Sequence, residues 1–534
     1  MKRPLGAQIS HMLKDRGVEV IFGIPGVHNQ EMYRGIEEAG LIHVLARHEQ
    51  GAGFMADGYA RATGAPGVAY VITGPGLCNI MTPMGQAYSD SVPMLVIASC
   101  LDETAATRGQ LHQMKDQRAA AATVCDWSEE ARTAEAAYGL IDRALMEFEL
   151  GRKRPKAIHV PIAQLEAMAP PAPARCRDLP HHDVIRQRGL AEHLRPVTER
   201  LLAARRPIFI LGGGLAAGSA QEDVGRMLER FGAAAFTTYA GRGLVAADAP
   251  LFLGSMLARP DSAEVLGQSD CVVVLGSDLA EVDLWRREAG ISPGAGIHVN
   301  LDAEVLAQAD PADMRVACDA VDFLAAAIPT QGAAPASDWT AEEAAGLRAR
   351  WRAQVNAERP GIVPVADALK AALPEDTMIY SDMTQFAYAA KEVWDMAFPG
   401  HWHHPTGFGT LGYALPAAIG GAMGRPGRPT LAIAGDYGFQ YTVQELATAV
   451  ELGLSLPIIL WDNGKLGEIE DSMVRAQIAP NAVVQRNPDF LKLAEAYGAA
   501  SAEPATLADL PGLLKTALAA EAPTLIRLTP DLAS

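Results

Sequence analysis

The sequence predicts an α/β protein made of three doubly wound α/β domains with mainly parallel sheets. Short, continuous apolar runs recur along the chain, as expected for strands buried on both faces of a parallel sheet, and helical segments separate them. At 534 residues the chain is too long for one hydrophobic core. Two stretches rich in proline and small residues, at residues 168–182 and 329–337, read as linkers that divide it into three parts.

The first third has five apolar runs that we expect to be strands. They lie at residues 18–22, 43–46, 68–72, 94–98 and 157–160. Gly23-Ile24-Pro25-Gly26 follows the first run, and we expect a tight turn there in which glycine permits a positive φ. We place an N-terminal domain at residues 1–166.

The middle third repeats this pattern. Strands are expected at residues 207–211, 234–238, 272–275 and 297–300, and a helix at residues 222–231. Gly212-Gly213-Gly214 follows the first strand and suggests a dinucleotide site, but the full G-x-G-x-x-G pattern with its acidic residue is missing. We therefore place a central Rossmann-like domain at residues 184–330 and do not expect it to bind FAD.

The last third, placed at residues 356–534 as a C-terminal domain, contains two strands that end in oxygen-bearing side chains. Its apolar runs lie at residues 377–380, 431–434 and 457–460. Asp436 and Asn463 follow the last two of these runs. Because the carboxyl ends of parallel strands meet at one edge of a sheet, we expect the two side chains to lie side by side. Hard oxygen ligands beside free backbone N–H groups suit Mg²⁺ that carries a diphosphate.

Composition excludes several classes of function. The net charge is −18 and no basic run occurs, which argues against a nucleic-acid partner. No signal-like apolar core follows the first residues, and no apolar run is long enough to span a membrane. The six cysteines form no C-x-x-C pair, as expected for free thiols in a reducing compartment. We expect a cytoplasmic protein.

The segments Gly435-Asp436-Tyr437-Gly438 and Asp462-Asn463 together resemble the signature of thiamine-diphosphate enzymes, Gly-Asp-Gly followed further along by Asn-Asn. Tyr437 replaces the usual second glycine, and Asp462 replaces the usual first asparagine. The resemblance implies Mg²⁺ bound by Asp436, Asn463 and the carbonyl of Lys465. It implies a cofactor-binding set of Thr384, Gln385, Gly409, Leu411, Gly435, Asp436, Tyr437, Gly438, Asn463, Lys465, Leu466 and Gly467.

Gly407-Phe408-Gly409-Thr410-Leu411-Gly412 is similar to a second segment of that family, Gly-x-Gly-Thr-(Met/Leu)-Gly. In the family, the bulky apolar residue wedges between the two rings of the cofactor and bends it. Leu411 holds this place, and the Gly409 carbonyl would accept from the 4′-amino group.

Glu49 lies at a junction between strand and helix, in the run from Arg47 to Arg61. A glutamate in a first helical turn is usually explained by the helix dipole alone. However, this run, the Gly-Ile-Pro-Gly turn and Gly74-Pro75-Gly76-Leu77-Cys78-Asn79 together resemble the pyrimidine-binding domain of thiamine-diphosphate-dependent decarboxylases and acetohydroxyacid synthases. The resemblance implies that Glu49 contacts N1′ of the aminopyrimidine. A carboxyl beside an apolar ring has a raised pKa and is therefore poised to exchange a proton with N1′.

Proton relays to the substrate are expected from the first domain. The candidates are His28, His112 and Gln113. Acetolactate synthases carry Phe-Gln-Glu near the last two, whereas this chain has Leu111-His112-Gln113, which counts against that activity. A lone histidine is more often structural, so each histidine here can be either a proton relay or a structural residue.

The substrate pocket is expected to include Val27 and the residues after Lys465, namely Glu468 and Ile469. Acetolactate synthases have an apolar residue where Glu468 stands, and a carboxylate there suits a cationic substrate. The Gly-Ile-Pro-Gly-Val-His and Leu-His-Gln-x-x-Asp-Gln segments are similar to those of enzymes that decarboxylate 5-guanidino-2-oxopentanoate. We therefore expect a 2-oxo acid substrate, this one among the candidates.

Three alternatives remain: an acetolactate-synthase-like carboligase, a protein that binds thiamine diphosphate without turnover, and an FAD-dependent oxidase of pyruvate type. Tyr437 and Asp462 are the residues that favour the second. Glu49 and Asp436 lie in different domains, and the resemblance implies that they meet across a subunit interface. We therefore expect a homodimer or homotetramer, with the helix that carries Ala52, Ala56 and Ala60 as part of the contact.

Overall fold

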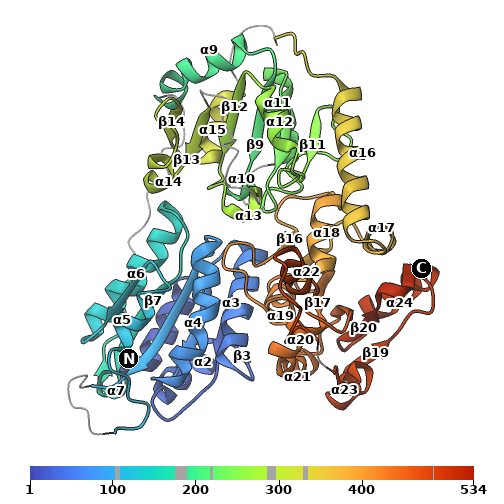
Figure 1. The fold of residues 1–534 in the computed structure, drawn as a ribbon. Coiled ribbons are helices and arrows are strands. Elements are labelled where there is room, and N and C mark those ends of the chain that lie inside the picture. The colour runs from blue at the N-terminus through green and yellow to red at the C-terminus, as the bar shows by residue number, and fades with distance from the viewer. Residues whose placement is uncertain are drawn as a thin grey trace.

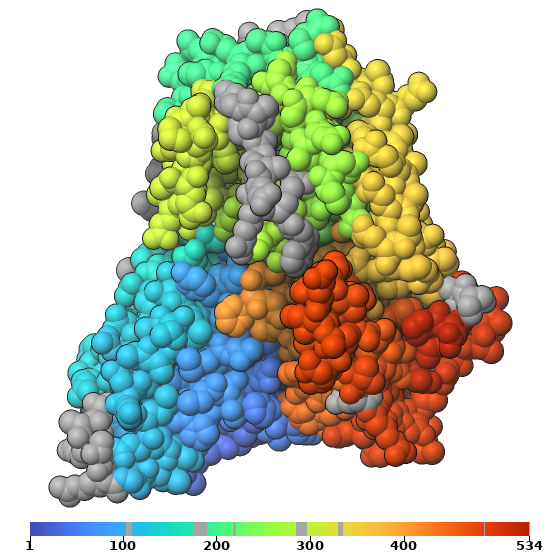
Figure 2. Space-filling view, viewed as in Figure 1, coloured from blue at the N-terminus to red at the C-terminus, as the bar shows by residue number. Residues whose placement is uncertain are grey.

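The computed structural model describes residues 1–102, 109–174, 189–216, 220–284, 296–328, 335–484 and 486–533. Three six-stranded sheets, one in each third of the chain, form three lobes (Figure 1). The middle domain lies above the N- and C-terminal domains, which stand side by side below it, and the space-filling view shows the same arrangement (Figure 2). Every strand pair within these sheets is parallel, so the predicted fold class is confirmed.

The N-terminal sheet has the strand order β3-β2-β4-β5-β7-β6. Its strands are β2 (Val20–Gly23), β3 (Ile42–Leu45), β4 (Gly67–Val71), β5 (Met94–Cys100), β6 (Trp127–Glu130) and β7 (Lys156–Pro161). Its helices are α1 (Leu5–Asp15), α2 (Gln30–Ala39), α3 (Glu49–Thr63), α4 (Pro75–Ser89), α5 (Gln117–Ala121), α6 (Ala134–Leu150) and α7 (Ile162–Glu166). The expected linker at 168–182 starts instead as a strand, since β8 (Met168–Ala169) pairs with β1 (Arg3–Pro4), and most of the remainder lies outside the described residues.

The middle sheet has the order β11-β10-β9-β12-β13-β14. Numbered along the chain within the sheet, this is 3-2-1-4-5-6, the order of doubly wound dinucleotide-binding folds. Its strands are β9 (Pro207–Leu211), β10 (Ala234–Thr237), β11 (Phe252–Gly254), β12 (Cys271–Leu275), β13 (Ile297–Asn300) and β14 (Met314–Ala317). Its helices are α9 (Arg195–Ala203), α10 (Gly213–Ala216), α11 (Gln221–Phe231), α12 (Ser262–Gly267), α13 (Glu281–Leu284), α14 (Ala303–Ala307) and α15 (Ala320–Ala327).

The C-terminal sheet has the order β16-β15-β17-β18-β20-β19. Its strands are β15 (Met378–Ser381), β16 (Trp402–His403), β17 (Thr430–Gly435), β18 (Pro457–Trp461), β19 (Ala500–Ala502) and β20 (Thr524–Leu528). Its helices, after the connecting α16 (Ala341–Glu358), are α17 (Ile362–Ala372), α18 (Gln385–Val393), α19 (Ala414–Gly424), α20 (Asp436–Tyr441), α21 (Leu446–Glu451), α22 (Gly467–Arg475), α23 (Phe490–Ala496) and α24 (Leu510–Leu518), with 3₁₀ turns η1 (Val443–Glu445), η2 (Leu507–Asp509) and η3 (Pro530–Ala533). Numbered along the chain, the N- and C-terminal sheets share the order 2-1-3-4-6-5.

The turn after β2 differs from its prediction. Gly23 and Gly26 do not have a positive φ. Gly23 needs to be glycine because a Cβ there would lie 2.3 Å from the Tyr70 carbonyl oxygen, whereas one on Gly26 would lie 2.2 Å from Ile72 Cδ1, the end of a side chain that can move. In the turn after β4, by contrast, Gly74 has a positive φ of 71°.

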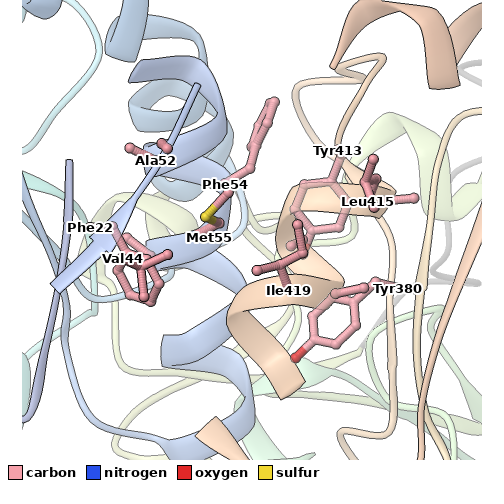
Figure 3. Packing of buried hydrophobic residues seen from close by; sticks show 14 of the residues in the cluster. Phe22, Val44, Ala52, Phe54, Met55, Tyr380, Tyr413, Leu415 and Ile419 are labelled. Carbon is pink, nitrogen blue, oxygen red and sulfur yellow. The ribbon is translucent and has the colours of Figure 1, made fainter. Parts of the chain in front are cut away.

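The N- and C-terminal domains of one chain pack through α3 and α19 (Figure 3). A Cβ on Gly58 would lie 1.9 Å from the Ala417 carbonyl oxygen, so the two helix backbones are in contact. Phe54 and Tyr413 meet edge to face, with ring centroids 5.5 Å apart. Ala52, Ala56 and Ala60 are all buried within the single chain, so these three side chains pack inside it. The expectation that other positions of their helix contact a second subunit stays a prediction.

No helix in the described ranges combines the length and the apolar character needed to cross a membrane.

Candidate functional site

Asp436 and Asp462 lie opposite each other at the carboxyl edge of the C-terminal sheet. Gly435 of β17 is in register with Trp461 of β18, and each aspartate follows its strand directly. Asn487 Nδ2 donates to Asp436 Oδ2 at 2.6 Å and to Asp462 Oδ1 at 2.9 Å. Asp436 and Asn463 were expected to lie side by side, but the residue directly across from Asp436 is Asp462, and Asn463 comes one position later.

The charge at this edge is only partly neutralised by the protein. Arg527 Nε donates to Asp462 Oδ2 at 2.7 Å. Asp436 is 2% exposed. Burial raises the pKa of the Asp436 carboxyl, and the Asp462 charge adds to this, although hydrogen bonds from Asn487 and from the backbone N–H of Tyr437 oppose it. A buried carboxylate without a cation of its own fits a divalent metal.

Asn463 and the start of α22 are held by the side chain of Gln385. Asn463 Nδ2 donates to Gln385 Oε1 at 3.2 Å, and the N–H of Lys465 donates to Asn463 Oδ1 at 3.3 Å. A Cβ on Gly467 would lie 2.4 Å from Gln385 Oε1, so the Gln385 amide packs directly on this helix start. Thr384 is the N-cap residue of α18 and lies against Gly435. The fold thus brings three segments predicted to hold the diphosphate, which contain Thr384 and Gln385, Gly435, and residues 463–467, to one edge of the sheet.

The loop that carries Gly409 and Leu411 is anchored by Asp382, a residue not predicted as part of the site. Asp382 Oδ2 accepts from the N–H of Gly412 at 2.8 Å, and burial raises the pKa of Asp382 to about 7. A Cβ on Gly438 would lie 2.4 Å from Asp382 Oδ2. The signal that could have found Asp382 is its place directly after strand β15, like Asp436 after β17.

Glu49 is the first residue of α3, at the carboxyl edge of the N-terminal sheet. The residue is 8% exposed, and its carboxylate accepts from Asn79 Nδ2 at 2.8 Å. Asn79 comes from α4, the helix that follows β4. Asn79 was not predicted as a site residue, although it lies in the Gly-Pro-Gly-Leu-Cys-Asn segment, one of those on which the family resemblance rests.

His28 and His112 stand together at the same edge, after β2 and β5. Their rings meet edge to face with centroids 4.8 Å apart. Among the described residues, neither Nδ1 atom has a hydrogen-bond partner. Burial and the neighbouring His112 lower the pKa of His28, against a smaller opposing effect of Asp102. The loop is strained at His112, whose φ is 63°, and Gln113 Oε1 accepts from the N–H of Gln110 at 3.2 Å.

A buried polar network supports this pair and was missed by sequence reasoning. Gln117 Oε1 accepts from the N–H of Gly74 at 3.0 Å, and Gln117 Nε2 lies 3.0 Å from His159 Nδ1. His159 Nε2 lies 2.8 Å from Ser128 Oγ. A Cβ on Gly74 would lie 2.3 Å from the His112 carbonyl oxygen. The network therefore fixes the turn against which His112 rests.

The predicted pocket residues differ in their surroundings. Arg359 Nε donates to Glu468 Oε1 at 2.8 Å, so this carboxylate already has a cationic partner. Ile469 is 50% exposed and Val27 is 61% exposed. The N–H of Leu466 donates to the Val483 carbonyl at 2.8 Å, which turns the chain into α22.

Within one chain, these residues form two groups on two sheet edges. Glu49, His28 and His112 share the first edge, and the residues from Thr384 to Glu468 share the second. Among the described residues, the hydrogen bonds of Glu49 and Asp436 stay within their own domains. Nor do those residues include any cluster of three His, Cys, Asp or Glu side chains suited to a metal. The predicted metal shell has one carboxylate, one amide oxygen and one carbonyl, so it needs no such cluster.

Comparison with known proteins gives matches along most of the chain. Three family models match: "Thiamine pyrophosphate enzyme, N-terminal TPP binding domain" at residues 3–120, the central domain at residues 194–327, and the C-terminal TPP binding domain at residues 382–528. The chain is 42% identical to "Probable 2-ketoarginine decarboxylase AruI" of Pseudomonas aeruginosa, over 98% of this chain and 93% of that protein.

Two further relatives are synthases. The chain is 28% identical to "Acetolactate synthase isozyme 1 large subunit" of Escherichia coli, over 99% of this chain and 94% of the relative. It is also 28% identical to "Acetolactate synthase large subunit" of Corynebacterium glutamicum, over 93% and 82% respectively. The two matched cofactor-binding regions contain the two sheet edges described above, and the chain belongs to the thiamine pyrophosphate enzyme family.

Proposed function

We propose that this chain catalyses the non-oxidative decarboxylation of a 2-oxo acid with a cationic end, such as 5-guanidino-2-oxopentanoate, with thiamine diphosphate and Mg²⁺. The observation that carries the choice of substrate is the carboxylate of Glu468 at the start of α22, which binds a guanidinium at 2.8 Å in this structure. The 42% identity to a protein named as a 2-ketoarginine decarboxylase supports the same choice, because 2-ketoarginine is this acid.

The chain's own residues would hold the cofactor from both ends. Thiamine diphosphate, when bound, supplies the electron sink for the negative charge left by loss of CO₂. Asp436, Asn463 and the Lys465 carbonyl would bind Mg²⁺, with the diphosphate at the N-terminal turns of α20 and α22. Glu49 would share a proton with the pyrimidine N1′, and its bond to Asn79 would keep the carboxylate aimed at that atom.

The histidine pair is suited to proton transfer at the substrate. Both Nδ1 atoms lack protein partners among the described residues, and the lowered pKa of His28 keeps its ring neutral near pH 7. A neutral imidazole can take up or deliver a proton as the reaction needs. His112 and Gln113 would face the substrate carboxylate and carbonyl from the loop after β5.

The proposal also covers the domain boundaries and the oligomeric state of the protein. We take residues 1–166, 184–330 and 356–534 as the three domains, in a homodimer or homotetramer of the cytoplasm whose sites lie between subunits. The substrate is a small molecule, and no nucleic acid or membrane takes part.

The test is a CO₂-release assay of the enzyme loaded with thiamine diphosphate and Mg²⁺. The substrates are 5-guanidino-2-oxopentanoate, pyruvate and benzoylformate, and acetolactate is measured in the pyruvate reaction. The proposal expects the cationic acid to have the highest kcat/KM, and chelation of the metal to abolish turnover. Equal or better turnover of pyruvate would exclude the proposed substrate, and acetolactate as the main product would favour the carboligase that two of the relatives suggest.

A further inference from the structure

Arg359 lies where α16 ends and holds the carboxylate proposed to bind the substrate. It is the C-cap residue of α16, and its Nε donates to Glu468 Oε1 at 2.8 Å. The two side chains are 20% and 27% exposed, so solvent reaches the pair. Gly467, the neighbour of Glu468, packs on Gln385, one of the residues predicted to hold the diphosphate. The pair therefore stands at the border of the cofactor site.

The guanidinium of Arg359 is the same chemical group as the end of the proposed substrate. We infer that Arg359 is an internal competitor that sets the affinity for the cationic acid, by occupying Glu468 when no substrate is bound and by yielding the carboxylate to the substrate guanidinium. This inference rests on the proposed function. A neutral 2-oxo acid has no group that can replace Arg359, so it would leave the ion pair intact.

The neighbouring charges provide Arg359 with a second acceptor. Its Nη1 already lies 3.5 Å from Glu358 Oε2, and Glu358 Oε1 in turn accepts from Arg259 at 2.9 Å. A displaced Arg359 can therefore remain paired with Glu358, and the exchange leaves no isolated charge. The other acids near the start of α22 have local partners, since Glu470 pairs with Lys465 and Asp471 accepts from Gln385.

With an internal competitor, the apparent affinity equals the intrinsic affinity multiplied by the fraction of molecules in which Glu468 is free. If that fraction is about a tenth to a third, removal of Arg359 lowers the apparent dissociation constant by about 3- to 10-fold. A residue that only supports the fold would have the opposite effect, because its loss would weaken the binding of every substrate.

Arg359→Gln tests this role, with Arg352→Gln as the matched control. Arg352 lies on the same helix and pairs with Asp367 at the surface, so its loss removes a similar ion pair away from the site. Arg359→Gln should lower the KM for 5-guanidino-2-oxopentanoate by about 3- to 10-fold and leave that for 2-oxoheptanoate unchanged. Arg352→Gln should change neither. An equal rise of both KM values in Arg359→Gln would assign Arg359 a structural role.

A binding measurement separates this inference from the proposed function. In calorimetry with 4-guanidinobutanoate as the probe, Arg359→Gln should bind more tightly and Glu468→Gln more weakly than wild type. If Glu468→Gln weakens binding but Arg359→Gln does not strengthen it, only the role of Arg359 is wrong. If Glu468→Gln binds the probe like wild type and 2-oxoheptanoate is the better substrate, the proposed substrate is wrong as well.

Discussion

The aspartate that replaces the usual first asparagine of the cofactor motif has a compensating partner in this structure. Asp462 places a second carboxylate beside Asp436, and the two share one amide, Asn487 Nδ2. Arg527, on the neighbouring strand β20, neutralises Asp462 at 2.7 Å. The substitution therefore adds an ion pair at the edge of the site rather than a free charge, and Asp436 remains the carboxylate proposed to bind a metal.

The raised pKa of Asp436 predicts a pH dependence of metal binding. Mg²⁺ needs the ionised carboxylate, so protons compete with the metal. Because burial raises the pKa of Asp436 above its usual value, this competition should begin at a higher pH than for an exposed aspartate. We expect the affinity for Mg²⁺, measured by calorimetry with saturating thiamine diphosphate, to fall as the pH is lowered towards that pKa.

Asp462→Asn provides the control for this pH dependence. It removes the negative charge that helps to raise the pKa of Asp436, while Arg527 keeps its second partner, Glu503, at 2.9 Å. The decline of Mg²⁺ affinity should therefore shift to lower pH in this variant. An unchanged profile would mean that another group controls the competition.

The sequence could predict the parts of this site that follow strands directly. Asp436 and Asn463 were identifiable because each comes after a short apolar run. Asn487 and Arg527 were not, because they meet the two aspartates from 51 and 65 positions away and no local pattern marks them. Such partners depend on the pairing order of the whole sheet.

Among the elements, the contact between α3 and α19 is the one least tolerant of added atoms. A Cβ on Gly58 would lie 1.9 Å from the Ala417 carbonyl oxygen, and backbone cannot move aside as a side chain can. We expect Gly58→Ala to destabilise the chain by about 1 to 3 kcal/mol or more through overpacking. The thermal midpoint should fall, and the site at the start of α3 should lose activity with it.

Gly346→Ala is the matched change in a helix where space is open. A Cβ on Gly346 of α16 would meet nothing within 4 Å. The substitution should stabilise the chain by roughly 0.5 to 1 kcal/mol, because alanine restricts the unfolded chain and suits a helix interior. If both variants had the same thermal midpoint, the close approach of α3 and α19 would not matter to stability.

Glu445 joins the two cofactor-binding domains at the start of α3. Its Oε1 accepts from the N–H groups of Arg47 and His48, at 3.0 Å each. Burial raises the pKa of Glu445 from 4.5 to about 6. Because the folded chain holds this proton more tightly than the unfolded chain, the stabilisation is present below pH 4.5 and is lost as the pH rises through 6.

This linkage predicts a difference between wild type and Glu445→Gln that depends on pH. The wild-type chain should lose about 2 kcal/mol relative to the variant across this window and nothing further above pH 7. Thermal midpoints recorded for both proteins from pH 4 to pH 8 measure it. Parallel curves would show that Glu445 keeps an ordinary pKa in the folded chain.

Most of the strands that the sequence predicted are buried on both faces, and the edge strand β3 is an exception. The runs that became β5, β9, β17 and β18 are short, continuous and apolar, which is the pattern expected of a strand buried on both faces. The strands not predicted are mainly edges: β16 has two residues, and β14 alternates exposed and buried positions. β20 lies inside its sheet, but its apolar run is interrupted by Arg527, which donates a hydrogen bond to Asp462.

At the scale of the molecule, the N- and C-terminal domains place different chemistry on the same topology. In both sheets the strand order is 2-1-3-4-6-5. Glu49 follows the second strand of its sheet, and Leu411 follows the second strand of the other. His28 and Thr384 each follow the first strand. One edge thus carries the groups proposed to move protons, and the other carries the groups proposed to hold a metal and a diphosphate.

These two edges predict a result for mixed variants. If one cofactor lies between the first edge of one subunit and the second edge of another, Glu49→Gln and Asp436→Ala should each be inactive alone. Mixed in equal amounts under conditions that exchange subunits, they should recover up to about a quarter of the wild-type activity, because half of the dimers are mixed and each has one intact site of two. A mixture of Glu49→Gln with the chain that carries both substitutions should recover none, since no pairing then restores a site. Recovery limited to the sum of the separate activities would place both edges of one site within a single chain, and the contact of α3 with α19 would then have to orient Glu49 towards the Asp436 edge of its own chain.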